Sequence, residues 1–393
     1  MPDGFILEIP EMVGLPTSTR RKPQAPKRAW PAGTRIVSAD SHMLETDLWF
    51  DRFPEHLKAE APRMRFHDGG WDLTVGDKSM TPLPIAQNLC DALECYPGLT
   101  DLDARLADLD VEGVEKELIF PQRLFGLMMF GEVANKDHVF GAYNEHIAEV
   151  CAKAPGRLYP VMVPAYYAPD RAAESVARCK ALGAKCLMVP IKPGKYDEEG
   201  GRTIQYNHPR MDPLWAAIEA SGLPLAFHIG EAIPTAEPGA VGVSVLTQMG
   251  GFRQNWAQLT FSGVFDRFPG LRVVFVEAGL AWVASMLHDA DMIYNSFPTQ
   301  VSPKLAHPPS WYWRHHCYAT FMTDPVGLSL LDRIGADRVM WSSDYPHQNS
   351  TWPRSREVIA RDLAGLDAAQ RQKLVQGNVA RLYGLAAPTP LAV

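Results

Sequence analysis

Carboxylates and imidazoles stand at the ends of several short apolar runs in this sequence. Asp40 and His42 end the run RIVSADSH, His228 ends LPLAFHIG, Glu277 follows VVFV, and Asp344 follows VMWSS. If these runs are parallel β-strands, their carboxyl ends meet on one rim, which is where (β/α)8 barrels carry out catalysis. Carboxylates and imidazoles gathered there would bind one divalent metal ion and leave a position open for chemistry.

Asp40, His42, His228 and Asp344 are candidates for binding this metal ion. Residues two apart in a strand point to the same side of the sheet, so Asp40 and His42 would face one space. A carboxylate oxygen and an imidazole nitrogen suit Zn2+, Mn2+ or Fe2+. Taken alone, this spacing also fits an exposed Asp with a surface His, and a lone His228 fits a core histidine bonded to a backbone carbonyl. The joint placement at separate strand ends is what favours the metal site.

Two carboxylates are candidates for catalysis. Asp344 could bind the metal and also handle a proton, because a bound metal lowers the pKa of its water toward ~7. The alternative for Asp344 is a helix N-cap. Glu277 ends a buried strand, where a carboxylate needs either a partner or a task; the alternative is a salt bridge at the rim.

Three further residues are candidates for substrate binding. His347 could contact substrate or relay a proton, or it could be a surface histidine. Arg253 could bind a substrate carboxylate, or it could be a surface cation. Trp282 could stack on an aromatic substrate, although tryptophan is also common in protein cores.

The elements that must position these residues are predicted by alternation along the chain. From residue 101 onward, strand-like runs alternate with helix-like stretches, which is typical of a parallel sheet. The run at 35–42 is the first of eight predicted strands that occur in order along the chain. We therefore predict an α/β fold of the (β/α)8 TIM-like barrel type. The alternative is a doubly wound open sheet, which would need a Gly-rich phosphate loop; neither GxGxxG nor GxxxxGK[ST] occurs.

We predict three parts in the chain. Residues 1–34 form an N-terminal arm that is basic and Pro-rich in its second half, residues 35–386 form the barrel, and residues 387–393 form a tail. The barrel carries an insertion at 45–100 after its first strand and ends in C-terminal helices. The insertion would cover the barrel mouth or form a subunit contact.

Composition limits the classes of partner. The net charge of −7 argues against nucleic acid as the main partner. No apolar run approaches the ~18 residues of a membrane span. The six cysteines form no CxxC pair, so we predict reduced thiols in a cytoplasmic protein.

In the order and spacing of its motifs, the chain resembles the amidohydrolase superfamily. The similar branch includes aminocarboxymuconate semialdehyde decarboxylase and the hydroxybenzoate and resorcylate decarboxylases. The likeness covers about residues 35–386, and it rests on SADSHMLE, DLDARLADLDVEGVEKELIF, HPRMDPLWAAIEASGLPLAFHIGE, RVVFVEAGLAWV, RVMWSSDYPH and QGNVARLYGL.

The resemblance implies metal ligation by Asp40, His42, His228 and Asp344. Members of the branch have His-x-His or Glu-x-His at the end of strand one, whereas this chain has Asp-x-His, which keeps an oxygen donor. At the end of strand six the decarboxylases typically carry a catalytic His, and this chain has Glu277.

These observations predict a metal-dependent decarboxylase, a carbon–carbon lyase acting on a small carboxylated aromatic or ring-derived molecule. The alternative is a hydrolase that uses metal-bound hydroxide on a C–N, C–O or C–C bond. A third reading is a barrel-fold binding protein that has lost its metal. We expect one divalent metal, Zn2+ first and Mn2+ second. Because related barrels commonly form dimers or tetramers, we also expect a homodimer or homotetramer.

Overall fold

The computed structural model describes most of the barrel predicted at 35–386. The described residues are 35–45, 48–67, 70–76, 78–79, 97–129, 135–193, 204–229, 238–347 and 350–386. The predicted arm at 1–34 and tail at 387–393 lie outside the described residues, as does part of the predicted insertion.

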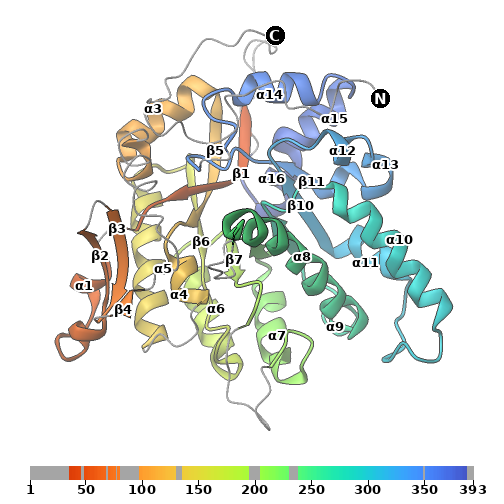
Figure 1. Ribbon diagram of the computed structural model, residues 1–393, viewed down its shortest axis with the longest axis horizontal. Helices are drawn as coiled ribbons and strands as arrows, with labels where there is room; N and C mark the ends of the chain where they lie inside the picture. Colours follow the sequence, from red (N-terminus) through yellow and green to blue (C-terminus); the bar gives the residue numbers. More distant parts are fainter. Residues whose placement is uncertain are drawn as a thin grey trace.

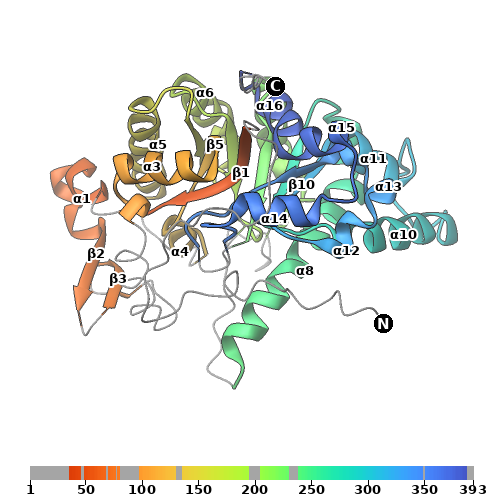
Figure 2. The same cartoon turned by 90° about the horizontal axis from the view of Figure 1, so that it is seen from above.

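Eight parallel strands form the central sheet, and they pair in the order in which they occur in the chain. A parallel bridge between Ser41 and Tyr345 joins the first strand to the chain just beyond the last. The sheet therefore closes into the predicted (β/α)8 barrel (Figure 1 and Figure 2). The strands are β1 (Ile36–Met43), β5 (Val114–Pro121), β6 (Leu158–Met162), β7 (Cys186–Val189), β8 (Leu225–His228), β9 (Val273–Val276), β10 (Cys317–Phe321) and β11 (Val339–Trp341).

The strands are apolar on both faces because helices cover the outside while side chains fill the inside. All four residues of β7, β8 and β9 are buried. Phe275 of β9 stacks on Trp313 at a ring-centroid distance of 6.0 Å, and it lies 6.0 Å from the ring of Phe227 on β8. Burying an aromatic side chain of this kind stabilises the fold by about 1.5–3 kcal/mol.

Helices follow the strands and form the outer layer (Figure 1). Gly113 and Gly222 end α3 and α7 in the left-handed conformation, with φ of 72° and 73°. The helices are α1 (Leu48–Arg52), α3 (Leu102–Glu112), α4 (Leu124–Met129), α5 (Lys136–Ala152), α6 (Ala172–Ala181), α7 (Asp212–Ser221), α8 (Ala240–Phe261), α9 (Val264–Arg267), α10 (Ala281–Ser296), α11 (Pro309–His316), α12 (Pro325–Leu328), α13 (Leu331–Ile334), α14 (Ser355–Asp362), α15 (Ala368–Gln372) and α16 (Asn378–Tyr383).

The described part of the 45–100 insertion contains a small antiparallel sheet beside α1 at the flank of the barrel (Figure 1). Its strands are β2 (Pro62–His67), β3 (Gly70–Val75) and β4 (Lys78–Ser79). The indole of Trp49 in α1 donates to the carbonyl of Val139 in α5 at 3.0 Å, so this unit is tied to the outer helices. None of the described helices is both long and apolar enough to cross a lipid bilayer.

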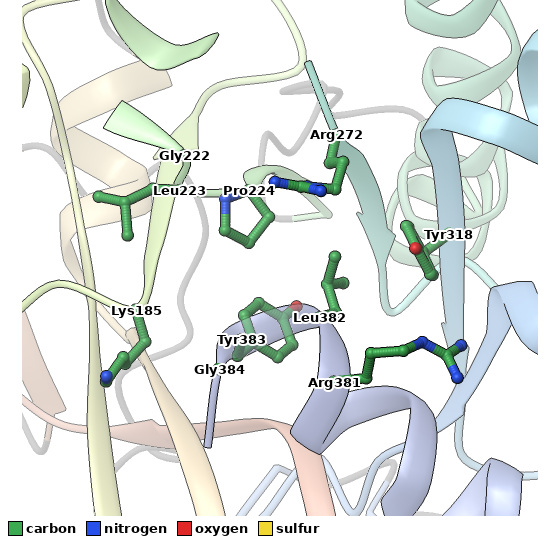
Figure 3. A pocket seen from close by; sticks show the side chains of 10 residues that line it. All are labelled: Lys185, Gly222, Leu223, Pro224, Arg272, Tyr318, Arg381, Leu382, Tyr383 and Gly384. Atoms are coloured by element: carbon green, nitrogen blue, oxygen red, sulfur yellow. The ribbon is translucent and has the colours of Figure 1, made fainter. Parts of the chain in front are cut away.

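A cavity of about 310 Å³ lies at the amino-terminal end of the barrel (Figure 3). Lys185, Pro224 and Arg272 line it, and they immediately precede β7, β8 and β9. Tyr383 of α16 lines it as well. The predicted ligands stand at the opposite, carboxyl ends of the strands, so this cavity is separate from them.

Candidate metal centre

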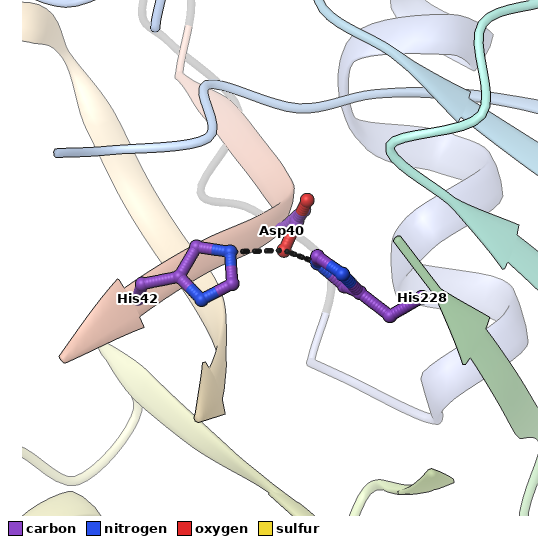
Figure 4. A group of neighbouring side chains, drawn as sticks. All are labelled: Asp40, His42 and His228. Atoms are coloured by element: carbon purple, nitrogen blue, oxygen red, sulfur yellow. Dashed lines mark hydrogen bonds and ion pairs between the residues drawn. The ribbon is translucent and has the colours of Figure 1, made fainter. Parts of the chain in front are cut away.

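The carboxyl ends of three strands, β1, β8 and β11, bring the predicted ligands together. Figure 4 shows three of them, Asp40, His42 and His228. His42 Nε2 lies 3.5 Å from Asp40 Oδ1 and 3.2 Å from Asp344 Oδ1. His228 Nε2 lies 3.2 Å from Asp40 Oδ1. All four side chains are at most 1% exposed. Asp40, His42 and His228 form one group whose geometry could hold a metal ion, and His42, Asp344 and His347 form a second.

Backbone carbonyls orient both predicted imidazole ligands. His42 Nδ1 is 2.7 Å from the carbonyl oxygen of Pro121, and His228 Nδ1 makes a short contact with the carbonyl oxygen of Ile229. A carbonyl only accepts, so each Nδ1 donates a proton to it; in a neutral imidazole the other nitrogen, Nε2, then keeps a lone pair for a metal ion. Such partners are typical of metal-binding histidines because they fix both the tautomer and the ring orientation.

Three buried atoms in this cluster have no hydrogen-bond partner among the described residues: Asp40 Oδ2, His42 Nε2 and Asp344 Oδ1. His42 Nε2 and Asp344 Oδ1 are only 3.2 Å apart, but they lack the alignment of a hydrogen bond. Two ligands about 2.0–2.1 Å from one tetrahedral ion are roughly 3.3 Å apart. The spacing and the unpartnered donor atoms therefore fit a single divalent cation.

The backbone at two of the strand ends has an uncommon conformation. Glu277 has φ of 58° and Asp344 has φ of 55°, in the left-handed region that side chains with a Cβ rarely adopt. Two hydrogen bonds stabilise these conformations. The N–H of Glu277 donates to Thr320 Oγ1 at 2.8 Å, and the N–H of Asp344 donates to the carbonyl of Asp40 at 3.2 Å.

Glu277 lies beside the cluster and is 15% exposed, with Oε2 4.0 Å from His228 Nδ1. Burial raises the pKa of Glu277 well above its usual value, and the negative charges of Asp344 and Asp40 raise it further. Both effects disfavour the ionised form of this carboxyl group.

Asp344 and His347 form a close ion pair. His347 Nδ1 lies 3.0 Å from both oxygens of the Asp344 carboxylate. Burial alone would raise the pKa of Asp344, but His347 and His42 hold that pKa below its usual range. Burial would likewise lower the pKa of His347, but the charge of Asp344 outweighs it and the pKa is raised. The His42 ring stacks on His347 with centroids 4.0 Å apart, and burial together with the charge of His347 lowers the pKa of His42.

Two of the predicted substrate-binding residues, Arg253 and Trp282, make their described contacts with other parts of the protein. Arg253, on α8, is 47% exposed and pairs with Asp289 of α10. The indole of Trp282 donates to the carbonyl of Gly279 at 3.1 Å, and its ring contacts Phe252, Phe275 and Trp313. No described hydrogen bond, ion pair or ring contact joins either side chain to the four predicted ligands. Their roles remain predictions.

Two residues that the sequence analysis did not single out support the cluster. The Glu45 carboxylate is 2% exposed and accepts the backbone N–H groups of Gln122, Arg123 and Leu124 at distances of 2.6–3.3 Å. Burial raises the pKa of Glu45 to about 7, although these N–H groups oppose the shift. Gln122 Oε1 lies 2.8 Å from His347 Nε2. Glu45 follows the motif Asp-x-His closely enough to be suspected, whereas nothing in the sequence marks the neutral Gln122.

Comparison with known proteins identifies the family. A family model described as "Amidohydrolase" matches residues 37–385. The chain belongs to the amidohydrolase family. The resemblance noted from its motifs is thereby confirmed.

Several of the proteins that the chain resembles are decarboxylases. The gamma-resorcylate decarboxylase of Rhodococcus jostii is 28% identical over 329 residues, which cover 77% of this chain and 96% of the relative. The structure of an amidohydrolase from Mycobacterium avium subsp. paratuberculosis is similar with a TM-score of 0.70 and 20% identity, covering 89% of this chain and 99% of that one. A 5-carboxyvanillate decarboxylase from Novosphingobium aromaticivorans, solved with bound manganese, has a TM-score of 0.68 and 19% identity, covering 92% and 100%.

Proposed function

We propose that this protein is a metal-dependent decarboxylase of a small carboxylated aromatic compound. The observation that carries the proposal is the convergence of two buried imidazoles and two buried carboxylates. Three of their atoms have no hydrogen-bond partner in the part of the chain that the structure describes. Family membership supports it, because the chain spans 96% of the length of a gamma-resorcylate decarboxylase at 28% identity.

In this proposal Asp40, His42, His228 and Asp344 hold one divalent ion. Two imidazole nitrogens and two carboxylate oxygens suit Zn2+, which is our first expectation, and Mn2+ is the second. Support for Mn2+ comes from the manganese bound in the 5-carboxyvanillate decarboxylase. When bound, the ion would supply a fixed positive charge that attracts the substrate carboxylate.

The remaining roles follow from what decarboxylation requires. Loss of CO2 breaks one carbon–carbon bond and leaves the electron pair on the ring carbon, which then takes up a proton. We assign to Asp344 the transfer of that proton and to Glu277 the task of assisting or orienting the reacting group. His347, Arg253 and Trp282 are proposed to contact the substrate.

The test is a paired assay of purified, metal-analysed protein with 2,6-dihydroxybenzoate and 5-carboxyvanillate. We expect CO2 release and no transfer of ¹⁸O from labelled water into the aromatic product. Entry of ¹⁸O without CO2 release would instead support the hydrolase alternative. Absence of bound metal after refilling with Zn2+ or Mn2+ would contradict the metalloenzyme proposal.

We further propose that the protein is a cytoplasmic homodimer or homotetramer. The four described cysteines, Cys151, Cys179, Cys186 and Cys317, are buried free thiols, which supports a reducing compartment. Light scattering coupled to size-exclusion chromatography would test the assembly. A mass near 43.6 kDa, the mass of one chain, would contradict it.

A further inference from the structure

The turn between β5 and α4 forms one wall of the metal centre, and its backbone is held by a single buried side chain. The Glu45 carboxylate accepts the N–H groups of Gln122, Arg123 and Leu124, three consecutive residues. Since Glu45 follows β1, which also carries His42, the turn is fixed to the strand that provides two predicted ligands. The ring of Phe125, the next residue, lies 6.2 Å from the His42 ring and 4.9 Å from the His228 ring.

The side chain of Gln122 reaches from this turn to His347. Its Oε1 is 2.8 Å from His347 Nε2, while His347 Nδ1 is 3.0 Å from the Asp344 carboxylate. Both ring nitrogens of His347 therefore have protein partners, and one face of the ring stacks on His42. Together these three contacts fix the orientation of the His347 ring relative to Asp344.

We propose that Gln122 is a positioning residue, and that Glu45 places it. Gln122 Oε1 anchors the far edge of His347, so that the near edge is held against Asp344. This inference rests on the proposed function, in which Asp344 both binds the ion and transfers a proton. The side chain of His347 is 26% exposed, so packing alone does not prevent the ring from rotating away.

The effect of Gln122 follows from the two hydrogen bonds that hold the His347 ring, one to Gln122 and one to Asp344. A His347 ring with one hydrogen bond can turn about its χ angles, whereas a ring with bonds at both nitrogens has a single satisfied orientation. Partners of this outer kind typically change metal affinity or activity by roughly 10–100-fold when they are removed. The loss should appear in turnover, and KM should change as well, because His347 is proposed to contact the substrate.

The experiment compares Gln122→Met with Gln122→Glu in zinc-loaded protein. Methionine keeps the length of the side chain but removes the acceptor oxygen, and glutamate restores an acceptor. We expect Gln122→Met to lower kcat by roughly 10–100-fold, and Gln122→Glu to recover much of that loss. Gln258→Met is the matched control, since Gln258 makes its 3.2 Å side-chain bond to Gln205 and not to the metal centre.

A spectroscopic readout separates positioning from general destabilisation. In ¹⁵N-labelled protein, the His347 Nε2–H should give a downfield proton resonance, assigned by its absence in His347→Phe. We expect Gln122→Met to abolish this resonance without changing zinc content, while Gln122→Glu and Gln258→Met retain it. Glu45→Gln keeps an acceptor oxygen for the turn and should retain the signal, whereas Glu45→Ala should lose it.

The outcomes distinguish this inference from the proposed function. Wild-type kcat in Gln122→Met, or a resonance that persists in that variant, would overturn the positioning role and leave decarboxylation untouched. Conversely, wild-type protein without decarboxylase activity would remove the proposed function. Loss of the resonance in Gln122→Met alone would still support the anchoring of His347.

Discussion

Removal of the metal ion should destabilise the fold, and the structure sets the scale of the effect. Asp40 Oδ2, His42 Nε2 and Asp344 Oδ1 are buried, and none of the described residues provides them with a hydrogen-bond partner. Each buried polar group left unsatisfied costs about 1–3 kcal/mol, so the three together cost about 3–9 kcal/mol that a bound ion would offset. A second estimate comes from the fact that a ligand binding only the folded state stabilises it. A metal ion present at a thousandfold excess over its Kd raises the free energy of unfolding by about 4.1 kcal/mol.

The assay is calorimetric unfolding of metal-loaded and chelator-stripped protein at matched ionic strength. For a chain of this length, 1 kcal/mol corresponds to roughly 1–2 °C in Tm, so we expect a loss of roughly 5–15 °C on stripping. His228→Ala should unfold at nearly the same temperature with and without added Zn2+. Asp289→Asn, which alters a carboxylate paired with Arg253 on the outer helices, should keep the full metal-dependent shift.

Equal Tm values for loaded and stripped wild-type protein, with one ion per chain verified by elemental analysis in the loaded sample, would refute this reasoning. That result would mean that the unpartnered atoms are satisfied equally well without the ion. A shift that persists in His228→Ala would place the stabilising ion elsewhere in the protein.

Three other predictions follow from the site and from the wider fold. His228→Ala and Asp344→Asn should each abolish decarboxylation while circular dichroism stays unchanged, and activity retained in Asp344→Asn would remove Asp344 from the mechanism. Glu277→Gln should lower turnover at least ~100-fold, in the range of acid–base groups, and near-normal turnover would leave Glu277 a purely structural role. Burial raises the pKa of Glu112 to about 7, so the folded protein keeps a proton there that the unfolded chain releases above its usual pKa of 4.5. The unfolding free energy should therefore fall by up to about 3 kcal/mol as pH rises from about 4.5 to 7, and Glu112→Gln should flatten that slope in urea titrations.

The sequence was sufficient where short-range periodicity determines the structure. Apolar runs such as VVFV predicted buried parallel strands, and the two-residue spacing of Asp40 and His42 predicted that both side chains face one space. Those strands are present, and the imidazole of His42 lies 3.5 Å from Asp40 Oδ1. His228 and Asp344 are 116 residues apart; their places at the ends of apolar runs made them candidates, and the family resemblance indicated that both are ligands.

Long-range polar contacts could not be predicted in this way. Glu45 and Gln122 are 77 residues apart, and the bond from the Gln122 N–H to the Glu45 carboxylate depends on the pairing of β1 with β5. Gln122 carries no charge and belongs to no motif, so its contact with His347 is visible only in the folded chain. The ion pair between Arg253 and Asp289 could not be predicted from the sequence either, because the two residues lie on different helices.

The backbone at the strand ends gives an independent reason to regard Glu277 and Asp344 as functional residues. Among the described residues, three that are not glycine have positive φ, namely Asn135, Glu277 and Asp344. The left-handed conformation costs roughly 1–2 kcal/mol for a residue with a Cβ, and glycine would avoid that cost. Asparagine and aspartate tolerate this conformation comparatively well, but glutamate gains nothing there from its own backbone. Glu277, which is 15% exposed and close to the negative charge of the buried Asp344, is therefore difficult to explain by stability alone. Strain of this kind clusters at functional sites, where the surrounding structure compensates for it.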